Sequence, residues 1–270
     1  MAIATLGMCA STSSASLSLF SAPPLTRLTV SCSSSLSWSP VDKTLTQIQN
    51  SGVIACLRAN SAKLALKAAR AALSGGISVV LQQLVHEHPT TALGVILFLG
   101  HFQFTIHQIR SRSYSLKLPS FLQIGTVLNV EDAKNAKNAG AKFLMSPAMI
   151  KDITVEVQCG EVVYIPGVMT PTEILAAYDA GAKIVKVYPV SALGGSQYIS
   201  ALKRPFDHIS MVASQGITID SIGEYIARGA TSVVLSDAIF DREAIGRNNF
   251  NEIYQLAQSA ALLGNKAVER

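Results

Sequence analysis

The sequence is short of charge, of cysteine and of long apolar runs, and each shortage excludes a class of protein. Only 14% of the 270 residues are charged and 49% are hydrophobic, which excludes a disordered chain or a coiled coil. The best apolar run, 92–99, ends at Gly100 and falls well short of the roughly 20 residues of a membrane helix. The four cysteines and five histidines lack metal-binding spacing, so neither a metal site nor a disulfide framework is expected. The composition predicts a soluble globular protein of one large domain or two small ones.

Acidic residues are missing from two segments, and this accounts for the net charge of +5. The segment 1–41 contains Arg27 and no acid, and the segment 96–124 contains three basic residues and no acid. Without these four of the 22 basic residues, 18 remain against 17 acidic ones, a net charge of +1. A basic face for nucleic acid is therefore not expected.

Residues 1–40 contain 12 Ser and 4 Thr and too few periodic apolar positions to join a core. This composition is typical of a plastid transit peptide, and the alternative is a disordered tail without a targeting role. A secretory signal fits less well, because no basic segment precedes a continuous apolar stretch. We therefore predict a location in the chloroplast stroma and leave this segment out of the fold.

Eight short apolar runs follow, and helical patterns that end at glycine separate them. From Phe143 onward their spacing is roughly 20 to 27 residues, one strand plus one crossover helix, which indicates a parallel sheet. We predict an α/β fold, a (β/α)8 TIM barrel over 41–245, followed by a C-terminal helix over 246–270. An open doubly wound sheet is disfavoured because no glycine-rich phosphate loop follows the first run. The runs are Val53–Leu57, Ile77–Val80, Ala92–Val95 (resumed at Gly125–Leu128), Phe143–Met145, Val162–Ile165, Ile184–Tyr188, Met211–Ala213 and Ser232–Leu235.

The helix boundaries have recognisable capping residues. Thr170 and Glu173 form the pattern of a capping box, and Gly181 is placed to end that helix. The same pattern predicts helices that begin at Asn129 and end at Gly140, and that begin at Thr218 and end at Gly229.

Lys186 is the most informative residue. The segments AGAKFLMSP and AGAKIVKVYP match each other, and Met145 in the first stands where Lys186 stands in the second. Alternation along the strand places Lys186 opposite Val185 and Val187, and so inside the barrel. Burial lowers the pKa of an amine and makes it a nucleophile toward ketones, as Schiff-base chemistry requires. The alternative is a structural lysine at the barrel mouth, paired or hydrated.

Two loops near the end of the chain are candidates for phosphate binding. They are Ser214–Gly216 after the seventh run and Leu235–Asp237 after the eighth. Barrels commonly hold phosphate there with backbone N–H groups, and Gly216 permits close approach of the backbone. Such a pattern is common in loops, so it supports a phosphate site only in combination with Lys186.

The motifs IGTVLN, MSPAM, YIPGVMTPTEI, KIVKVYPVSALGG, ASQGIT and VVLSDAIF stand in the order and spacing typical of one family. In these motifs the chain resembles the 2-keto-3-deoxy-6-phosphogluconate and 4-hydroxy-2-oxoglutarate (KDPG/KHG) aldolases, and looks like a plant plastid branch. The resemblance is close over 125–241 and looser over 53–76. It implies a homotrimeric, metal-free and cofactor-free class I aldolase, which cleaves a 2-keto acid to pyruvate and an aldehyde.

The resemblance implies a role for seven residues. Lys186 is similar to the Schiff-base lysine, and Thr126 to the residue that contacts pyruvate. The other substrate-binding positions are Arg58, Pro147, Ser214, Gly216 and Ser236. The family's Thr-Gly-Gly reads Ser-Gln-Gly here, and its Gly-Gly-Ser reads Val-Leu-Ser. Gln215 therefore stands where a backbone should approach phosphate, which favours a different aldehyde half.

The sequence also departs from the family in its second and third strands. The family's general acid and base, a glutamate in the second strand, has no counterpart in GGISVVLQQLV, where strand runs directly into a helical pattern. Glu87 lies too far along the chain, and Glu173 is explained as a capping residue. The third strand is split by 29 residues, 96–124. We interpret these departures as a skipped exon and a retained intron, the alternative being a genuine basic segment that binds a partner or a membrane surface.

The residues thus support a Schiff-base aldolase, impaired by the loss of a proton-transfer group worth about 10²- to 10⁴-fold. The alternative is a non-catalytic barrel that binds a phosphorylated or keto-acid metabolite. An isomerase on the same barrel is a third reading, weakened by the lack of a paired acid and base.

Overall fold

Parallel strands form a ring in the part of the chain that the structure describes. The computed structural model describes residues 38–58, 62–83, 122–138, 140–157 and 161–269. The strands are β1 (Val53–Leu57), β2 (Val80–Gln83), β3 (Leu122–Gly125), β4 (Phe143–Met145), β5 (Val163–Ile165), β6 (Gly167–Val168), β7 (Ile184–Val187), β8 (Ser210–Ser214) and β9 (Ser232–Leu235). Their order in the sheet is β5-β4-β3-β2-β1-β9-β8-β7-β6, and every pairing is parallel.

The ring closes through Pro166. The two end strands of the sheet, β5 and β6, are consecutive in the chain and are separated by this residue alone. The Lys186 backbone N–H donates to the Pro166 carbonyl at 2.8 Å, which continues the ladder across the junction. Because β5 and β6 together occupy one strand position, the ring has eight strand positions. The predicted (β/α)8 barrel is thereby confirmed.

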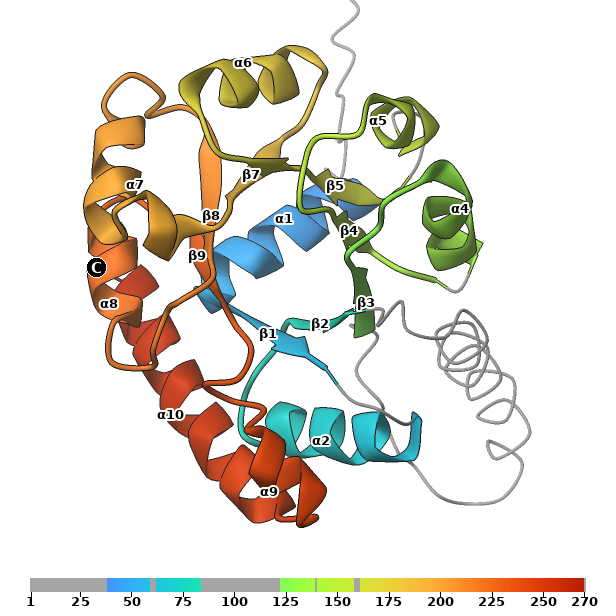
Figure 1. Ribbon diagram of the computed structural model, residues 1–270, viewed down its shortest axis with the longest axis vertical. Coiled ribbons are helices and arrows are strands. Elements are labelled where there is room, and N and C mark those ends of the chain that lie inside the picture. The colour runs from blue at the N-terminus through green and yellow to red at the C-terminus, as the bar shows by residue number, and fades with distance from the viewer. Residues whose placement is uncertain (1–37, 59–61, 84–121, 139, 158–160, 270) are drawn as a thin grey trace, which may run out of the picture. The chain divides into compact units, whose positions relative to one another are not determined.

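Helices surround the ring on its outer side (Figure 1). They are α2 (Ala62–Ser74), α4 (Val130–Asn138), α5 (Lys151–Val157), α6 (Pro171–Asp179), α7 (Ser196–Lys203), α8 (Ile222–Ala227), α9 (Arg242–Gly246) and α10 (Phe250–Val268), with a short 3-10 helix, η1 (Val190–Leu193). The last of these helices, α10, lies within the C-terminal segment for which a helix was predicted.

Alternation along the strands separates two apolar layers. Val185 and Val187 pack in the cluster that the outer helices cover, whereas Ile184 packs in the interior of the ring. The interior cluster also contains Met145, as expected from the match between the two segments. Its members are Ile48, Ile54, Cys56, Val79, Leu81, Phe143, Met145, Val163, Ile165, Ile184, Val212 and Val234.

The amino-terminal end of the ring is covered by α1 (Pro40–Ser51). Ser39 caps this helix by accepting a hydrogen bond from the Asp42 N–H. Ile48 is 1% exposed and belongs to the interior cluster, and Val41 and Leu45 pack against it. The helix thereby buries the apolar end of the barrel that would otherwise face water.

Most of the predicted helix boundaries are confirmed. Thr170 and Glu173 form both hydrogen bonds of a capping box, and Asn129 Oδ1 accepts from the Asp132 N–H before α4. The prediction that a helix begins at Thr218 is wrong, because α8 begins at Ile222. Thr218 instead forms a turn that is closed by hydrogen bonds with Ser221. Serine and threonine side chains often compete with helix formation in this way, because they bond to nearby backbone groups.

The predicted course of the second and third strands is wrong at several residues. The sequence places the second strand at 77–80 and runs it into a helix, but β2 continues to Gln83, paired with β1 and β3. The third strand includes Leu122–Ile124, which the sequence assigns to the irregular insert, and it pairs on both sides. Backbone pairing with both neighbours outweighs local propensity here. Three predictions concern segments outside the described residues. They are the first half of the third strand, the origin of the insert 96–124 and the targeting role of 1–40.

Gly167 tests the closure of the ring. A Cβ at Gly167 would lie 2.0 Å from the Pro147 carbonyl oxygen, and a backbone atom cannot yield as a side chain can. We expect Gly167→Ala to lower the free energy of unfolding by about 1–3 kcal/mol, as overpacking does. Gly223→Ala is the matched control, because nothing lies within 4 Å of a Cβ there, and alanine favours the helix by roughly 1 kcal/mol. Denaturant unfolding measures both, and equal stability of the two variants would contradict the closure described here.

Candidate active site

The predicted site residues gather at one end of the ring. Because all the strands are parallel, their carboxyl ends share one face of the barrel. Lys186 lies within β7 and Ser214 is the last residue of β8. The others follow strand ends: Arg58 after β1, Thr126 after β3, Pro147 after β4, Gly216 after β8 and Ser236 after β9.

Lys186 is buried inside the ring. Its side chain is on the face of β7 shared with Ile184, and the residue is only 8% exposed. Its Nζ lies 5.0 Å from the centre of the Tyr188 ring, a cation–π distance. Burial lowers the pKa of Lys186 from 10.5 to about 8, and the Cys56 thiol opposes this shift weakly. The neutral fraction near neutral pH is thus far larger than that of an ordinary lysine, as predicted for a nucleophilic amine.

Cys56 is a neighbour of Lys186 that the sequence analysis did not select. It is 6% exposed and belongs to the interior cluster, and burial raises its thiol pKa to about 11. Arg58 and Lys186 both oppose that rise, so both lie within electrostatic reach of the thiol. The alternation of β1, in which Ile54 and Cys56 face inward, is the pattern that would have identified it.

An ion pair borders the site. Arg58 Nη1 lies 4.0 Å from Asp237 Oδ1, and both side chains are partly exposed. The Ser236 hydroxyl donates to the same carboxylate oxygen at 3.3 Å. Asp237 therefore links the end of β9 to the end of β1, a role that its place in an ordinary strand-to-helix loop did not indicate.

Pro147 and Thr126 are distinguished by their backbones. The Pro147 carbonyl packs on Gly167, the residue that pairs with Lys186 in the ladder. Thr126 has φ +61°, an unusual left-handed conformation for a β-branched residue. Such strained backbone is held by its surroundings, and it is often found near functional sites.

The interior of β2 offers no carboxylate to Lys186. Leu81 is the residue of β2 in the interior cluster, and it pairs in register with Cys56. Within the described part of the chain, Cys56 is the only titratable group whose field shifts the Lys186 pKa.

The pKa of Lys186 predicts a pH profile. Its folded pKa lies below its unfolded value, so the neutral amine appears as pH rises through about 8. We expect the initial rate of adduct formation with pyruvate to rise with a midpoint near 8, measured by borohydride trapping and peptide mapping. Adducts at exposed lysines serve as the internal control, because their midpoint lies near the ordinary value of about 10.4. A Lys186 midpoint at that higher value would contradict its burial.

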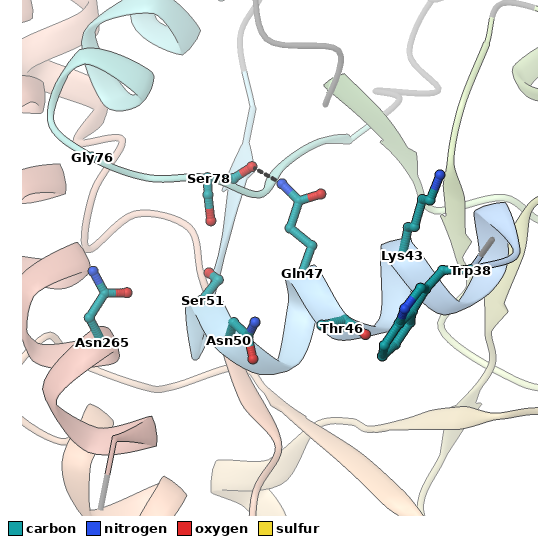
Figure 2. A pocket seen from close by; sticks show the side chains of 9 residues that line it. All are labelled: Trp38, Lys43, Thr46, Gln47, Asn50, Ser51, Gly76, Ser78 and Asn265. Atoms are coloured by element: carbon teal, nitrogen blue, oxygen red, sulfur yellow. Dashed lines mark hydrogen bonds between the residues drawn. The ribbon is translucent and has the colours of Figure 1, made fainter. Parts of the chain in front are cut away.

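The cavity drawn in Figure 2 lies at the other end of the barrel. It has a volume of about 470 Å³, and its lining includes Lys43, Gln47 and Trp38 from α1 and its start, and Asn265 from α10. The Gln47 side chain donates to the Ser78 carbonyl at 3.0 Å, which fixes α1 to the segment before β2. Lys186 is not among the lining residues, so this cavity is separate from the candidate active site.

Two features are absent from the described residues. None of the described helices is long and apolar enough to cross a membrane. In the same part of the chain, no group of three His, Cys, Asp or Glu side chains is placed to hold a metal ion.

Comparison with known proteins decides the family. The family model for KDPG and KHG aldolase matches residues 111–256, more than half of the chain. The chain belongs to the KDPG and KHG aldolase family. It is 33% identical over 137 residues to the 2-dehydro-3-deoxy-phosphogluconate aldolase of Treponema pallidum, and 27% identical over 136 residues to the KHG/KDPG aldolase of Escherichia coli K12. These matches cover 51% and 50% of this chain and 65% and 64% of the two relatives, so the chain spans less than two thirds of their length.

Solved structures support the fold of this aldolase-family chain. The KDPG aldolase of Legionella pneumophila, with pyruvate captured as a covalent carbinolamine, has a TM-score of 0.66 at 23% identity and covers 83% of this chain and 98% of its own. The corresponding enzyme of Zymomonas mobilis has a TM-score of 0.67 at 21% identity and covers 82% and 98%. A thiamine phosphate pyrophosphorylase of Pyrococcus furiosus also has a TM-score of 0.53 at 15% identity, covering 79% and 98%. Because proteins of different chemistry share the fold, function has to be argued from the site.

Proposed function

We propose that this chain is a class I aldolase that cleaves a 4-hydroxy-2-keto acid to pyruvate and an aldehyde. The observation that carries the proposal is the buried amine of Lys186, with its lowered pKa, at the carboxyl end of a (β/α)8 barrel. The membership of the KDPG and KHG aldolase family supports the same reaction. Arg58, Thr126, Pro147, Ser214, Gly216 and Ser236 are the residues proposed to contact the substrate.

The reaction follows from the amine. Neutral Lys186 attacks the C2 carbonyl of the substrate, and uptake of one proton from solvent with loss of water leaves a protonated Schiff base. The C3–C4 bond then breaks, its electron pair moves toward the iminium, and the C4 hydroxyl loses its proton as the aldehyde departs. A proton returns to C3 of the resulting enamine, and water releases pyruvate and regenerates the amine.

The proton-transfer steps of the proposed reaction are expected to be slow in this chain. The Cys56 thiol has its pKa raised to about 11 and stays protonated near neutral pH, so it is a poor base. Leu81 occupies the interior position of β2 opposite Cys56. Water must therefore carry the protons unless a residue outside the described part of the chain supplies a base, and slow turnover is expected.

Trapping with pyruvate tests the proposal. Incubation of the full chain with pyruvate and borohydride should add one reduced pyruvate to Lys186, identified by peptide mapping. An adduct that maps elsewhere, or no adduct at any pH, would refute the proposed function. Formation of pyruvate from each 2-keto acid, followed with lactate dehydrogenase, then shows whether the chain also turns over.

A non-catalytic barrel that binds a keto acid is the second candidate. Leu81 favours it, because an apolar side chain takes the interior place nearest to Cys56 on β2. This protein would form the Schiff base at Lys186 and release no aldehyde. The two candidates therefore differ in turnover and share the adduct.

Assembly and location belong to the same proposal. A trimer is supported by the exposed apolar side chains of Met169, Leu175 and Tyr178 on and before α6, each at least 42% exposed. Light scattering should then give a molar mass three times that of one chain.

A plastid location is supported by the acid-free, Ser-rich composition of 1–40. Fusion of this segment to a fluorescent protein should direct it to chloroplasts of a plant cell.

A further inference from the structure

Gln215 gives the loop after β8 an unusual conformation. Its φ of +87° lies in the left-handed region, which glycine adopts freely and a long side chain seldom does. Its Oε1 accepts a short hydrogen bond from the Ser191 hydroxyl, which belongs to η1 after β7. A contact between side chains of two different loops thus holds the strained residue in place.

Ser191 also covers the next residue. A Cβ at Gly216 would lie 2.5 Å from both Cβ and Oγ of Ser191, so the serine fills the space beside the glycine Cα. The sequence predicted that this glycine lets the backbone approach a phosphate. In the structure a side chain of the same protein makes the close approach.

The adjacent loop carries a negative charge. β8 and β9 are neighbours in register, with Ser214 beside Val234, so the loops that follow them lie together. Asp237 follows β9 and pairs with Arg58, and its side chain is 58% exposed. A phosphate dianion that bridged the two loops would meet this carboxylate, and it would share the positive charge of Arg58 with it.

We propose that Gln215 makes this chain select 4-hydroxy-2-keto acids that end in a carboxylate over those that end in a phosphate ester. The inference rests on the aldolase function proposed above. Because the Gln215 Oε1 is engaged by Ser191, its amide N–H groups point away from that contact, and no described residue accepts a hydrogen bond from them. A neutral amide donor can bind one carboxylate by a hydrogen bond, whereas a phosphate dianion is bound best by several backbone N–H groups and cations.

Borohydride trapping at Lys186 measures the preference without requiring turnover. The full chain is titrated with 4-hydroxy-2-oxoglutarate and with 2-keto-3-deoxy-6-phosphogluconate, and intact adducts are separated by mass. Pyruvate, which has no distal end, is trapped in parallel as the reference for Schiff-base formation. We expect half-saturation at a roughly tenfold or more lower concentration for the dicarboxylate, the ratio that one good polar contact provides.

Substitutions assign the preference to the amide. Gln215→Gly fits the left-handed backbone and should fold well. It should reduce the preference about tenfold by opening the turn to phosphate. Gln215→Asn keeps an amide and tolerates positive φ, so it should retain most of the preference. Asp237→Asn should improve trapping of the phosphorylated acid.

The outcomes separate this inference from the function on which it rests. Absence of the pyruvate adduct would remove the proposed function itself. A normal pyruvate adduct together with equal half-saturation for the two acids, or with a ratio that Gln215→Gly leaves unchanged, would overturn the inference alone.

Discussion

Lys186→Met should abolish the pyruvate adduct and any aldolase turnover. Methionine has nearly the volume of lysine without its amine, and Met145 already occupies the matching position of β4 inside the ring. No other group with a lowered pKa lies in the interior of the described barrel, so no second nucleophile is expected to replace Lys186. Mass spectrometry after borohydride reduction measures the loss, and residual adduct at the wild-type level would defeat the assignment.

Lys186→Met should also be more stable than the parent protein. A missing adduct in this variant would then not be a result of misfolding. Below pH 8 the buried Lys186 is protonated in both states, and the folded state carries the full cost of desolvation. The shift from 10.5 to about 8 corresponds to roughly 3 kcal/mol, an upper limit to the gain in the free energy of unfolding at pH 7.

The pH dependence of stability provides a control. In the parent, the contribution of Lys186 rises between about pH 8 and 10.5, because the unfolded chain then binds more protons. Cys56 acts in the opposite direction between its ordinary pKa of 9.0 and its raised pKa of about 11, because the folded state then keeps the proton. Lys186→Met should remove the rise and leave the fall. A profile identical to that of the parent would contradict the burial of the amine.

Leu81→Glu should raise turnover by about 10²- to 10⁴-fold, the range typical of a positioned proton-transfer group. Leu81 faces the interior and pairs with Cys56, whose field reaches Lys186. A carboxylate there would lie near the amine, and the two charges would offset part of their burial. Pyruvate release from both 2-keto acids is the measurement.

Leu81→Gln is the matched control for this gain. The glutamine side chain has the same length and hydrogen-bonding shape but does not ionise, so it should leave turnover near the parent rate. The pyruvate adduct at Lys186 is measured in both variants to show that the amine remains reactive. Equal turnover of the two variants, with the adduct retained, would favour the non-catalytic barrel over the aldolase.

The barrel was predictable because its patterns are repeated. Short apolar runs, the capping box of Thr170 and the glycine ends of helices recur along the chain, and each copy supports the others. The inward direction of Lys186 followed from the alternation of β7, and the packing of Val185 and Val187 against the outer helices confirms it. These inferences needed only the period of the strand and the chemistry of the side chain.

The remainder could not be predicted, because it depends on contacts between distant segments. The segment LQQ, which follows the predicted strand 77–80, reads locally as helix, and only its pairing with β1 and β3 makes it part of a strand. The contacts of Asp237 with Arg58, and of Ser191 with Gln215, join loops from different strands. The assignments of Arg58, Thr126, Pro147, Ser214, Gly216 and Ser236 to substrate contacts remain predictions.

The helix α1 has a consequence for the order in which products depart. Because Ile48 of this helix fills the amino-terminal end of the described ring, the proposed reaction would use the face where the strands end. In that proposed reaction the pyruvate part is covalently attached to Lys186, whereas the aldehyde part is no longer attached to the protein once the C3–C4 bond has broken. The proposed mechanism therefore expects the aldehyde to leave first, so added aldehyde should compete with protonation of the enamine. Reversal of the cleavage thus needs no second passage through the protein.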